Sequence, residues 1–350
     1  MSNDRVPTRK RLWTLLKWSL TAVVLAFVAL RAASLWRQGT RGDVEFHVAW
    51  LVLAGLFYGC AWLPSAWYFK ALMARMGDHV AWRPVLRAYY CGHLGKYAPG
   101  KALVPIIRGQ MVAAAGGRFS SGALAVVYES VVMMGVAAEL SIALVAFLLP
   151  TDLERTPALL HGVVTSAWGR WVLERPWLLP TAVLLSVIAT LPVVGRLFAF
   201  MAQKIAPAEN GRNLTRRIDA GLIGSGFVLF STAWVIHGLS LWAVLRGIGA
   251  NVALADLPTW VACIALSMAA GFFAIFAPGG VGVREGVMIE VLQIQPGIEP
   301  RHAVAAAFAL RLVGFLTEVA IAAVLYYGLM PRTPLENDAR SDDAGPMEPR

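Results

Sequence analysis

Long apolar runs separated by short polar ones dominate the chain. Six runs are long enough to cross a bilayer, since about 20 apolar residues in a helix span a ~30 Å hydrocarbon core. They lie at residues 12–35, 46–69, 121–149, 177–195, 221–245 and 303–329. The pattern predicts an all-α polytopic membrane protein, with one integral membrane domain over residues 1–330. Residues 331–350 are polar and predict a disordered cytoplasmic tail.

Two further apolar stretches, 85–115 and 258–294, are interrupted by glycine and proline. Irregular backbone at membrane depth is tolerated only where it is buried in protein or lines a water-filled cavity. We therefore expect two re-entrant hairpins or discontinuous helices. The residues expected to form their turns are Pro99, Gly100, Pro278, Gly279, Gly280 and Gly282.

The two interrupted stretches share a short motif. Ala98-Pro99-Gly100 recurs 179 positions later, at Ala277, and Glu139 and Glu318 are related by the same offset. Halves at 12–150 and 177–331 would each hold an odd number of spans, which predicts an inverted repeat of the kind found in many transporters. Chance recurrence of three common residues is the alternative.

Composition and charge narrow the class further. The chain is 58% hydrophobic and 15% charged, whereas soluble domains are about a quarter charged. Its net charge of +10 comes from basic residues spread between apolar runs, so we expect no nucleic-acid binding. The three cysteines have no metal-ligand spacing, and we expect neither a metal nor another cofactor.

Lysine and arginine predict the orientation. With the N-terminus inside, the inside segments 1–17, 70–118, 196–217 and 332–350 carry 5, 8, 5 and 3 of them, or 21 of 31. This asymmetry predicts that both termini are cytoplasmic.

Several ionisable residues lie within the apolar segments, where a charge costs ~2.5–3.5 kcal/mol at a helix centre. Glu129 and Glu139 lie in the third span, and Arg311 and Glu318 in the last. Arg311 and Glu318 share a helix face two turns apart, so each should face a partner on another element. We expect Glu129 or Glu139 to pair with Arg284 or Arg311, either to hold the bundle together or to form a substrate path.

The hairpins carry further candidates. Lys96, Tyr97, Lys101 and Arg108 follow or precede the first turn, where cations and free backbone N–H groups could hold a phosphate. Ordinary positive-inside charge is the alternative. In the second hairpin, three glycines precede Arg284-Glu285 and predict a tight turn that opens a short helix. His237 stands alone in the fifth span, which is typical of a hydrogen-bonded packing histidine, with a proton relay as the alternative.

These motifs resemble the lysylphosphatidylglycerol synthase transmembrane-region family over residues 12–330. The resemblance rests on Tyr97-Ala-Pro-Gly-Lys101 with Arg108, on Tyr128-Glu129, on Pro278-Gly-Gly-Val-Gly-Val-Arg-Glu285 and on Arg311. It implies a multi-pass inner-membrane protein that handles lipids. Family members with a fused synthase domain aminoacylate phosphatidylglycerol, and their membrane part translocates the product. Since the chain ends 20 residues after its last span, we expect no lysyl transfer.

The resulting hypothesis is a flippase, not an enzyme, for a phospholipid or lipid-linked head group. Lys96, Lys101 and Arg108 would meet the phosphate from the cytoplasm. The midplane path would be lined by Glu129, Arg284, Glu285 and Arg311. One alternative is a membrane transferase that uses Asp43 and Glu45 in the first outside loop, and another is an accessory subunit of a lipid-synthesis enzyme.

Overall fold

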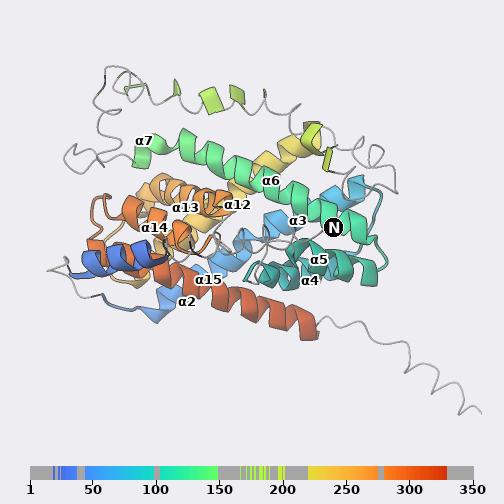
Figure 1. Cartoon of the computed structure of the whole chain (residues 1–350), viewed down its shortest axis with the longest axis horizontal. Helices are drawn as coiled ribbons and strands as arrows, with labels where there is room; N and C mark the ends of the chain where they lie inside the picture. The colour runs from blue at the N-terminus through green and yellow to red at the C-terminus, as the bar shows by residue number, and fades with distance from the viewer. Residues whose placement is uncertain are drawn as a thin grey trace, which may run out of the picture.

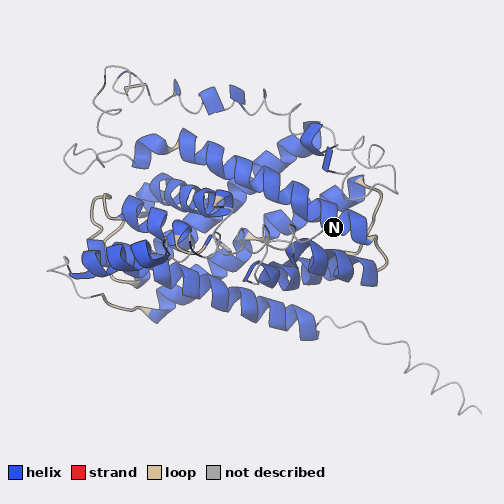
Figure 2. Cartoon of the chain, viewed as in Figure 1, coloured by secondary structure: helices blue, strands red, loops and turns tan. Residues whose placement is uncertain are grey.

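The computed structural model describes residues 25–37, 44–97, 103–148, 220–274 and 280–328, with isolated positions at 19, 23 and between 166 and 201. These residues form helices, turns and short connections, and none of them lies in a β-strand (Figure 2). The predicted all-α class is confirmed. The tail at 331–350, most of the predicted span 177–195 and part of the predicted span 12–35 lie outside the described residues.

Five helices in the described part of the chain are long and apolar enough to cross a membrane. They are Val48–Arg75, Phe119–Ala143, Gly221–Gly247, Leu254–Phe273 and Pro300–Gly328. Four of them coincide with predicted spans, and the polytopic membrane architecture is confirmed. The fifth, Leu254–Phe273, is the first arm of the predicted second hairpin, so that arm is longer than the sequence pattern indicated.

The span Val48–Arg75 consists of two helices, α2 (Val48–Ala61) and α3 (Leu63–Arg75), which meet at Trp62. Pro64 occupies the first turn of α3, where the N–H that proline lacks would have no helical acceptor. Close to the junction, the Gly59 carbonyl accepts a hydrogen bond of 2.8 Å from the Tyr90 hydroxyl. A neighbouring helix therefore helps to satisfy the backbone at the interruption.

Small residues bring α2 close to α15 (Pro300–Gly328). A Cβ added to Gly55 would lie 2.8 Å from Thr317 Oγ1, and one added to Gly59 would lie 2.7 Å from Ile321 Cδ1. Because residue numbers rise together on both helices, α2 and α15 run parallel. Glycines four residues apart are a common means of close helix packing in membranes.

The first hairpin follows α3. It consists of α4 (Trp82–His93), the short 3₁₀ helix η1 (Leu94–Tyr97) and α5 (Leu103–Ala114). Arg118, which follows α5, binds Asp78, which precedes α4, through its backbone N–H (3.0 Å) and its Nε (3.1 Å). The hairpin therefore enters with α4 and leaves with α5 at the same end of the bundle. This is the end where α3 finishes, here called the α3 end. The predicted turn residues Pro99 and Gly100, with Lys101, lie outside the described residues.

From the first hairpin, α6 (Phe119–Ala143) and the short α7 (Val145–Leu148) lead to the opposite end of the bundle, where α2 begins. This is called the α2 end. The next long helix among the described residues, α12 (Ala220–Gly247), belongs to the predicted second half and runs antiparallel to α2 and α3. The His47 N–H donates to the Gly247 carbonyl (2.8 Å) at one end, and Gly226 contacts Tyr68 near the other.

The second hairpin enters from the α2 end. A 3₁₀ turn, η4 (Leu254–Asp256), leads into α13 (Leu257–Phe273), and α14 (Val283–Leu292) returns. Thr259 in α13 and Gln295 after α14 both donate to carbonyls of α7, Phe147 (3.3 Å) and Leu148 (3.0 Å). The two hairpins therefore open at opposite ends of the bundle.

Residues 25–37, within or next to the first predicted span, are helical and pack on the second hairpin. Arg31 Nε lies 2.6 Å from Glu290 Oε1 in α14. Arg301 Nε, at the start of α15, donates to the Trp36 carbonyl (2.8 Å). This helix therefore connects two elements of the second half.

The packing relations of one half recur in the other. In each half the two hairpin arms pack on each other, and the second arm packs on the helix that follows. The first arm of each hairpin contacts the last helix of the other half, α4 against α15 and α13 against α6. In Figure 1, α6 and α15 run along opposite edges of the bundle with the hairpins between them. Such exchanged contacts are what a repeat of inverted orientation would produce.

Candidate functional site

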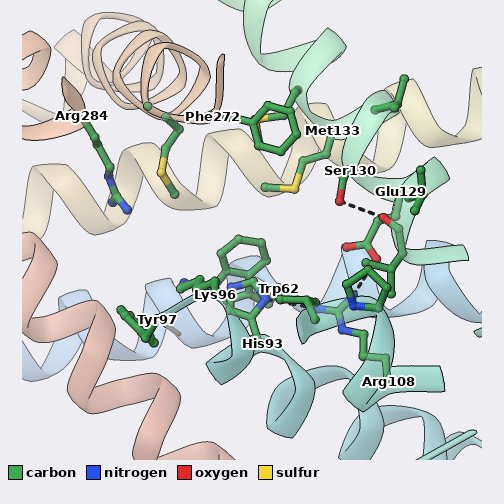
Figure 3. Close-up of a pocket in the computed structure, with 18 of the residues that line it drawn as sticks. Trp62, His93, Lys96, Tyr97, Arg108, Glu129, Ser130, Met133, Phe272 and Arg284 are labelled. Atoms are coloured by element: carbon green, nitrogen blue, oxygen red, sulfur yellow. Dashed lines mark hydrogen bonds and ion pairs between the residues drawn. The ribbon is translucent and has the colours of Figure 1, made fainter. Parts of the chain in front are cut away.

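A cavity of about 380 Å³ lies between the two hairpins (Figure 3). Its volume falls within the ~300–1,000 Å³ typical of ligand pockets. Much of its wall is apolar and comes from α5, α6 and α13, with Val104, Val126, Met133, Met134, Met268 and Phe272. Four basic side chains also line it, namely Lys96, Arg108, Arg284 and Arg311. An apolar wall with a few converging charges suits an amphipathic ligand.

Glu129, on α6, is held at one side of the cavity by α4 and α5. Its Oε2 accepts a hydrogen bond from Arg108 NH1 (2.8 Å), and its Oε1 accepts one from the Tyr89 hydroxyl (2.5 Å). The same guanidinium donates to the Tyr89 carbonyl (3.3 Å), and its Cζ lies 3.7 Å from the centre of the Tyr89 ring. The Arg108 and Glu129 side chains are only 2% and 5% exposed. This is a closed ion pair with most of its hydrogen-bonding groups engaged.

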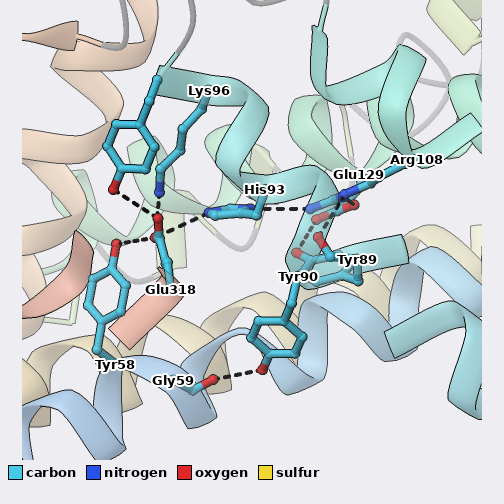
Figure 4. Close-up of polar contacts among 10 residues, drawn as sticks. Tyr58, Gly59, Tyr89, Tyr90, His93, Lys96, Arg108, Glu129 and Glu318 are labelled. Carbon is cyan, nitrogen blue, oxygen red and sulfur yellow. Dashed lines mark hydrogen bonds and ion pairs between the residues drawn. The ribbon is translucent and has the colours of Figure 1, made fainter. Parts of the chain in front are cut away.

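Glu318, on α15, forms a second buried cluster (Figure 4). Its Oε1 accepts hydrogen bonds from Lys96 Nζ (2.5 Å) and the Tyr58 hydroxyl (2.9 Å), and its Oε2 accepts one from the Tyr97 hydroxyl (2.8 Å). The carboxylate side chain is 2% exposed, whereas that of Lys96 is 28% exposed. The cation of this pair therefore remains accessible from the cavity.

His93, at the end of α4, lies between the two clusters, as Figure 4 shows. Its Nδ1 is 3.2 Å from Arg108 NH2, and its Nε2 is 3.5 Å from Glu318 Oε1. The Trp62 ring packs against the imidazole with centroids 4.1 Å apart. One histidine thus contacts the cation of the first cluster and the anion of the second.

Glu285 links the second hairpin to α15. One oxygen accepts from Arg311, and the other accepts from the Gly282 N–H (2.7 Å) at the start of α14. Gly280 and Gly282 have φ of 71° and 89°, values that favour glycine, and a Cβ on Gly280 would lie 2.6 Å from the Gly271 carbonyl oxygen. The predicted tight turn before a short helix is therefore present.

Arg284 differs from the other three cations. It projects into the cavity opposite the Glu129 cluster (Figure 3). Lys96, Arg108 and Arg311 are paired with Glu318, Glu129 and Glu285. Arg284 forms no hydrogen bond or ion pair with any residue that the structure describes. The cavity therefore holds one positive charge that no described protein group neutralises.

The sequence profile of the family described as "Lysylphosphatidylglycerol synthase TM region" matches residues 12–322. The chain belongs to this family. Membership indicates a lipid-related function for this multi-pass membrane protein. A comparison with curated proteins finds no match.

In this member of the lysylphosphatidylglycerol synthase TM-region family, six of the eight predicted site residues line the cavity. They are Lys96, Tyr97, Arg108, Glu129, Arg284 and Arg311. Glu285 lies behind Arg311, and Lys101 lies outside the described residues, as do Pro278 and Gly279. Residues that are 215 positions apart, such as Lys96 and Arg311, are thus brought to one site.

The predicted pairing of the charges was wrong. Glu129 pairs with Arg108 rather than with Arg284 or Arg311, because α5 packs directly on α6. Arg311 pairs with Glu285, since α14 packs on α15. The expectation that Arg311 and Glu318 each face a partner on another element is confirmed. Glu139 is half-buried and has no ion-pair partner among the described residues.

Sequence reasoning did not select Glu318, His93, Tyr58 or Tyr89 as site residues. Glu318 carried a signal in the sequence, since it follows Glu139 at the same offset of 179 that separates the two Ala-Pro-Gly motifs, but the tyrosines carried none. His237 is buried against the rings of Tyr58 and Trp62, as expected of a packing histidine. Neither of its ring nitrogens has a hydrogen-bond partner in the described part of the chain, so the expected hydrogen bond is not found there.

The described residues contain no group of three or more His, Cys, Asp or Glu side chains placed to hold a metal ion. In the first outside loop, Glu45 is exposed and lies 3.3 Å from His47, while Asp43 is outside the described residues.

Proposed function

We propose that this protein translocates a lipid with an anionic head group, either a phospholipid or a lipid-linked phosphate, across the inner membrane. The observation that carries the proposal is the uncompensated charge of Arg284 in a cavity whose walls are largely apolar. An unpaired charge at membrane depth is costly and marks a substrate path by default. A phosphate is a fitting counter-ion, because the guanidinium can donate two parallel hydrogen bonds to it.

The arrangement of the hairpins supports transport rather than simple binding. One hairpin enters the bundle from the α3 end and the other from the α2 end, and both contribute lining residues to the cavity, so elements anchored at opposite ends of the bundle meet at one site. We place the α3 end in the cytoplasm, together with both termini, because the basic segments 1–17 and 70–118 would then lie inside. The proposal includes no catalytic step, since Glu129 in the cavity wall and Glu285 and Glu318 behind it are each paired with a cation.

The test is a head-group translocation assay in proteoliposomes. Fluorescent phosphatidylglycerol is incorporated, and the fraction that a membrane-impermeant quencher cannot reach is followed with time. Wild-type protein should increase the rate over empty liposomes, and Arg284→Gln should reduce that increase at least tenfold, since about 1.4 kcal/mol of lost head-group stabilisation corresponds to a factor of ten.

The matched control is Arg83→Gln, which removes the same charge from an exposed position at the start of α4, outside the cavity. This variant should translocate at the wild-type rate. Equal rates for Arg284→Gln and Arg83→Gln would refute the role of Arg284. No translocation by the wild-type protein alone would refute transport and favour an accessory subunit of a lipid-synthesis enzyme.

A further inference from the structure

We propose that the cavity selects phospholipids whose head group carries one negative charge and no amine, and that Lys96 enforces this selection by filling an ammonium site from within. The inference rests on the proposed function and adds to it the class of head group. The groups that carry it are the Lys96 ammonium, the Glu318 carboxylate and the rings of Trp62 and Tyr97 (Figures 3 and 4).

The surroundings of the Lys96 ammonium have the chemistry of an ammonium-binding site. Its Nζ lies 2.5 Å from Glu318 Oε1, 5.5 Å from the centre of the Trp62 ring and 5.1 Å from the centre of the Tyr97 ring. A cation within about 6 Å of an aromatic ring is attracted to its face, and ammonium ligands are commonly recognised in this way. One carboxylate and two rings would therefore suit the amine of a lipid head group if the lysine were absent.

The other two acids of the site do not offer such a place. Glu129 and Glu285 are paired with arginines, and each gives its second oxygen to a further donor, the Tyr89 hydroxyl or the Gly282 N–H. An ammonium does not reproduce the planar, forked donor set of a guanidinium. Among the acids that the structure describes at this site, Glu318 is therefore the one whose cation a head-group amine could replace.

The balance of charge at the cavity favours a single negative charge. Four cations line it, and three described acids are paired with three of them, which leaves the positive charge of Arg284. His93 adds no charge, since its Nδ1, 3.2 Å from Arg108 NH2, must accept from a group that only donates. One phosphodiester neutralises Arg284. The additional ammonium of a zwitterionic head group would then have no free acid among the described residues.

Lys96 is difficult for a lipid amine to displace. The lysine is tethered beside Glu318, so its effective concentration there is high, of the order of millimolar for a short flexible connection. A zwitterionic head group also brings no net charge to balance the lysine that it would expel. The 28% exposure of the Lys96 side chain shows that the site is reachable, and so the lysine itself excludes the amine.

Removal of the lysine side chain should change the selectivity of the cavity. Lys96→Ala leaves one unpaired cation, Arg284, and one unpaired anion, Glu318, close enough for their surroundings to interact, since the Arg284 charge acts on the position of the Lys96 ammonium. This pattern complements a zwitterionic head group, with the phosphate at Arg284 and the amine at Glu318. A head group without an amine should bind less well, because the charge of Glu318 opposes it.

The experiment compares two lipids with identical chains. Dioctanoyl phosphatidylglycerol and dioctanoyl phosphatidylethanolamine are titrated separately into protein in an uncharged detergent, and binding is measured by calorimetry. Wild-type protein should bind phosphatidylglycerol tighter by a factor of about ten or more, since a charged hydrogen bond is at stake. In Lys96→Ala the affinity for phosphatidylethanolamine should rise by a similar factor, and the affinity for phosphatidylglycerol should fall.

Two further variants are the controls. The double variant Lys96→Ala/Glu318→Gln removes both charges of the pair, so it should lose the gained affinity for phosphatidylethanolamine and prefer phosphatidylglycerol again. Lys70→Ala is the matched control for the loss of a lysine, since Lys70 lies in α3 outside the cavity wall. It should keep the wild-type preference.

A soluble amine tests the vacated site without any lipid. Propylammonium has the three carbons and the ammonium that Lys96→Ala removes, so propylammonium chloride should raise the thermal midpoint of Lys96→Ala above its value in sodium chloride of the same concentration. The wild-type protein and the double variant should show no such difference, because their site is filled or lacks its acid.

The outcomes separate this inference from the proposed function. Equal wild-type affinity for the two lipids would overturn the selectivity and leave the translocation that depends on Arg284 intact. No gain for phosphatidylethanolamine and no effect of propylammonium in Lys96→Ala would overturn the role of Lys96. Absence of binding of either lipid by the wild-type protein would overturn the lipid site itself, and the selectivity with it.

Discussion

Two buried glutamates belong to clusters that meet at His93, but their cations differ. Glu129 is paired with Arg108, whose side chain is 2% exposed, and Glu318 is paired with Lys96, whose side chain is 28% exposed. The arginine also donates to the Tyr89 carbonyl and to His93. The lysine has one carboxylate partner and a cavity beside it.

This difference in the cations indicates that Arg108–Glu129 is a structural ion pair, whereas in Lys96–Glu318 the lysine can leave its partner. Arg108 satisfies three acceptors on two elements at once, so its removal leaves several groups unpaired. Lys96 can move without disturbing the hydrogen bonds that Tyr58 and Tyr97 give to Glu318. The Glu129 cluster therefore fixes α4 and α5 against α6, while the Glu318 cluster can respond to what occupies the cavity.

Removal of Arg108 should have the largest effect on stability. Arg108→Ala leaves Glu129 buried without a cation, which typically costs about 3–5 kcal/mol. Thermal unfolding in detergent should show a large decrease in the midpoint temperature. The double variant Arg108→Met/Glu129→Gln should recover part of this loss, because it leaves no uncompensated charge. An Arg108→Ala midpoint close to that of the wild type would remove the distinction between the two clusters.

Removal of the lysine charge should cost less. In Lys96→Met, Glu318 loses one charged hydrogen bond, worth about 1.5–3 kcal/mol, but it keeps its two phenolic donors, Tyr58 and Tyr97. The measured loss of unfolding free energy should therefore be smaller than for Arg108→Ala, while translocation in proteoliposomes should be lost. A greater destabilisation by Lys96→Met than by Arg108→Ala would reverse the comparison.

Gly92 tests how rigidly Arg108 is held. A Cβ at this position would lie 2.4 Å from Arg108 Cγ, near the base of the side chain. Gly92→Ala should then displace the guanidinium and cost about 1–3 kcal/mol, as overpacking does in well-packed interiors. The control is Gly135→Ala, on α6, where no atom lies within 4 Å of the added Cβ. Equal unfolding midpoints for the two variants would show that Arg108 can move freely.

The two tyrosines on Glu318 should give the smallest effects and should differ from each other. Tyr58→Phe removes a hydrogen bond from a side chain that is 2% exposed, and should cost about 0.5–1.5 kcal/mol. Tyr97 is 40% exposed, so Tyr97→Phe should be close to neutral because water can replace the lost donor. Denaturation midpoints of the two variants test this order, which equal losses would contradict.

The architecture was largely predictable because lipid imposes simple rules. Runs such as 46–69 and 121–149 are long and apolar, and the structure places helices there. The pattern predicts a single broken segment at 258–294 and does not predict that its first arm is long enough to span the membrane. Helix α13 in fact continues to Phe273, where the glycine-rich turn is still to come. The glycine and proline content predicted where the turn before α14 lies, but it did not predict the length of α13.

The sequence predicted most of the charged residues that belong to the site, but it did not predict which acid pairs with which base. A charged side chain inside the bilayer costs free energy, so each one in an apolar segment is a candidate site residue. Arg284, Glu129 and Arg311 were predicted for this reason. Which acid meets which base depends on the order in which the helices pack, and one sequence does not contain that information. Tyr58 and Tyr89 were missed for a related reason, because an aromatic residue in an apolar run is compatible with lipid contact, with packing and with hydrogen bonding alike.

The close contact between α2 and α15 at Gly55 and Gly59 limits how the protein can change shape. Helices that interlock at so short a distance cannot slide past each other, since well-packed interfaces deform in discrete steps rather than continuously. Tyr58 and Glu318 therefore belong to one rigid body. If the cavity opens alternately to the two faces, the moving parts are the hairpins, which carry Lys96 and Arg284 toward and away from a stationary acid. The carboxylate is then the fixed reference of the cycle, and the cations are its mobile parts.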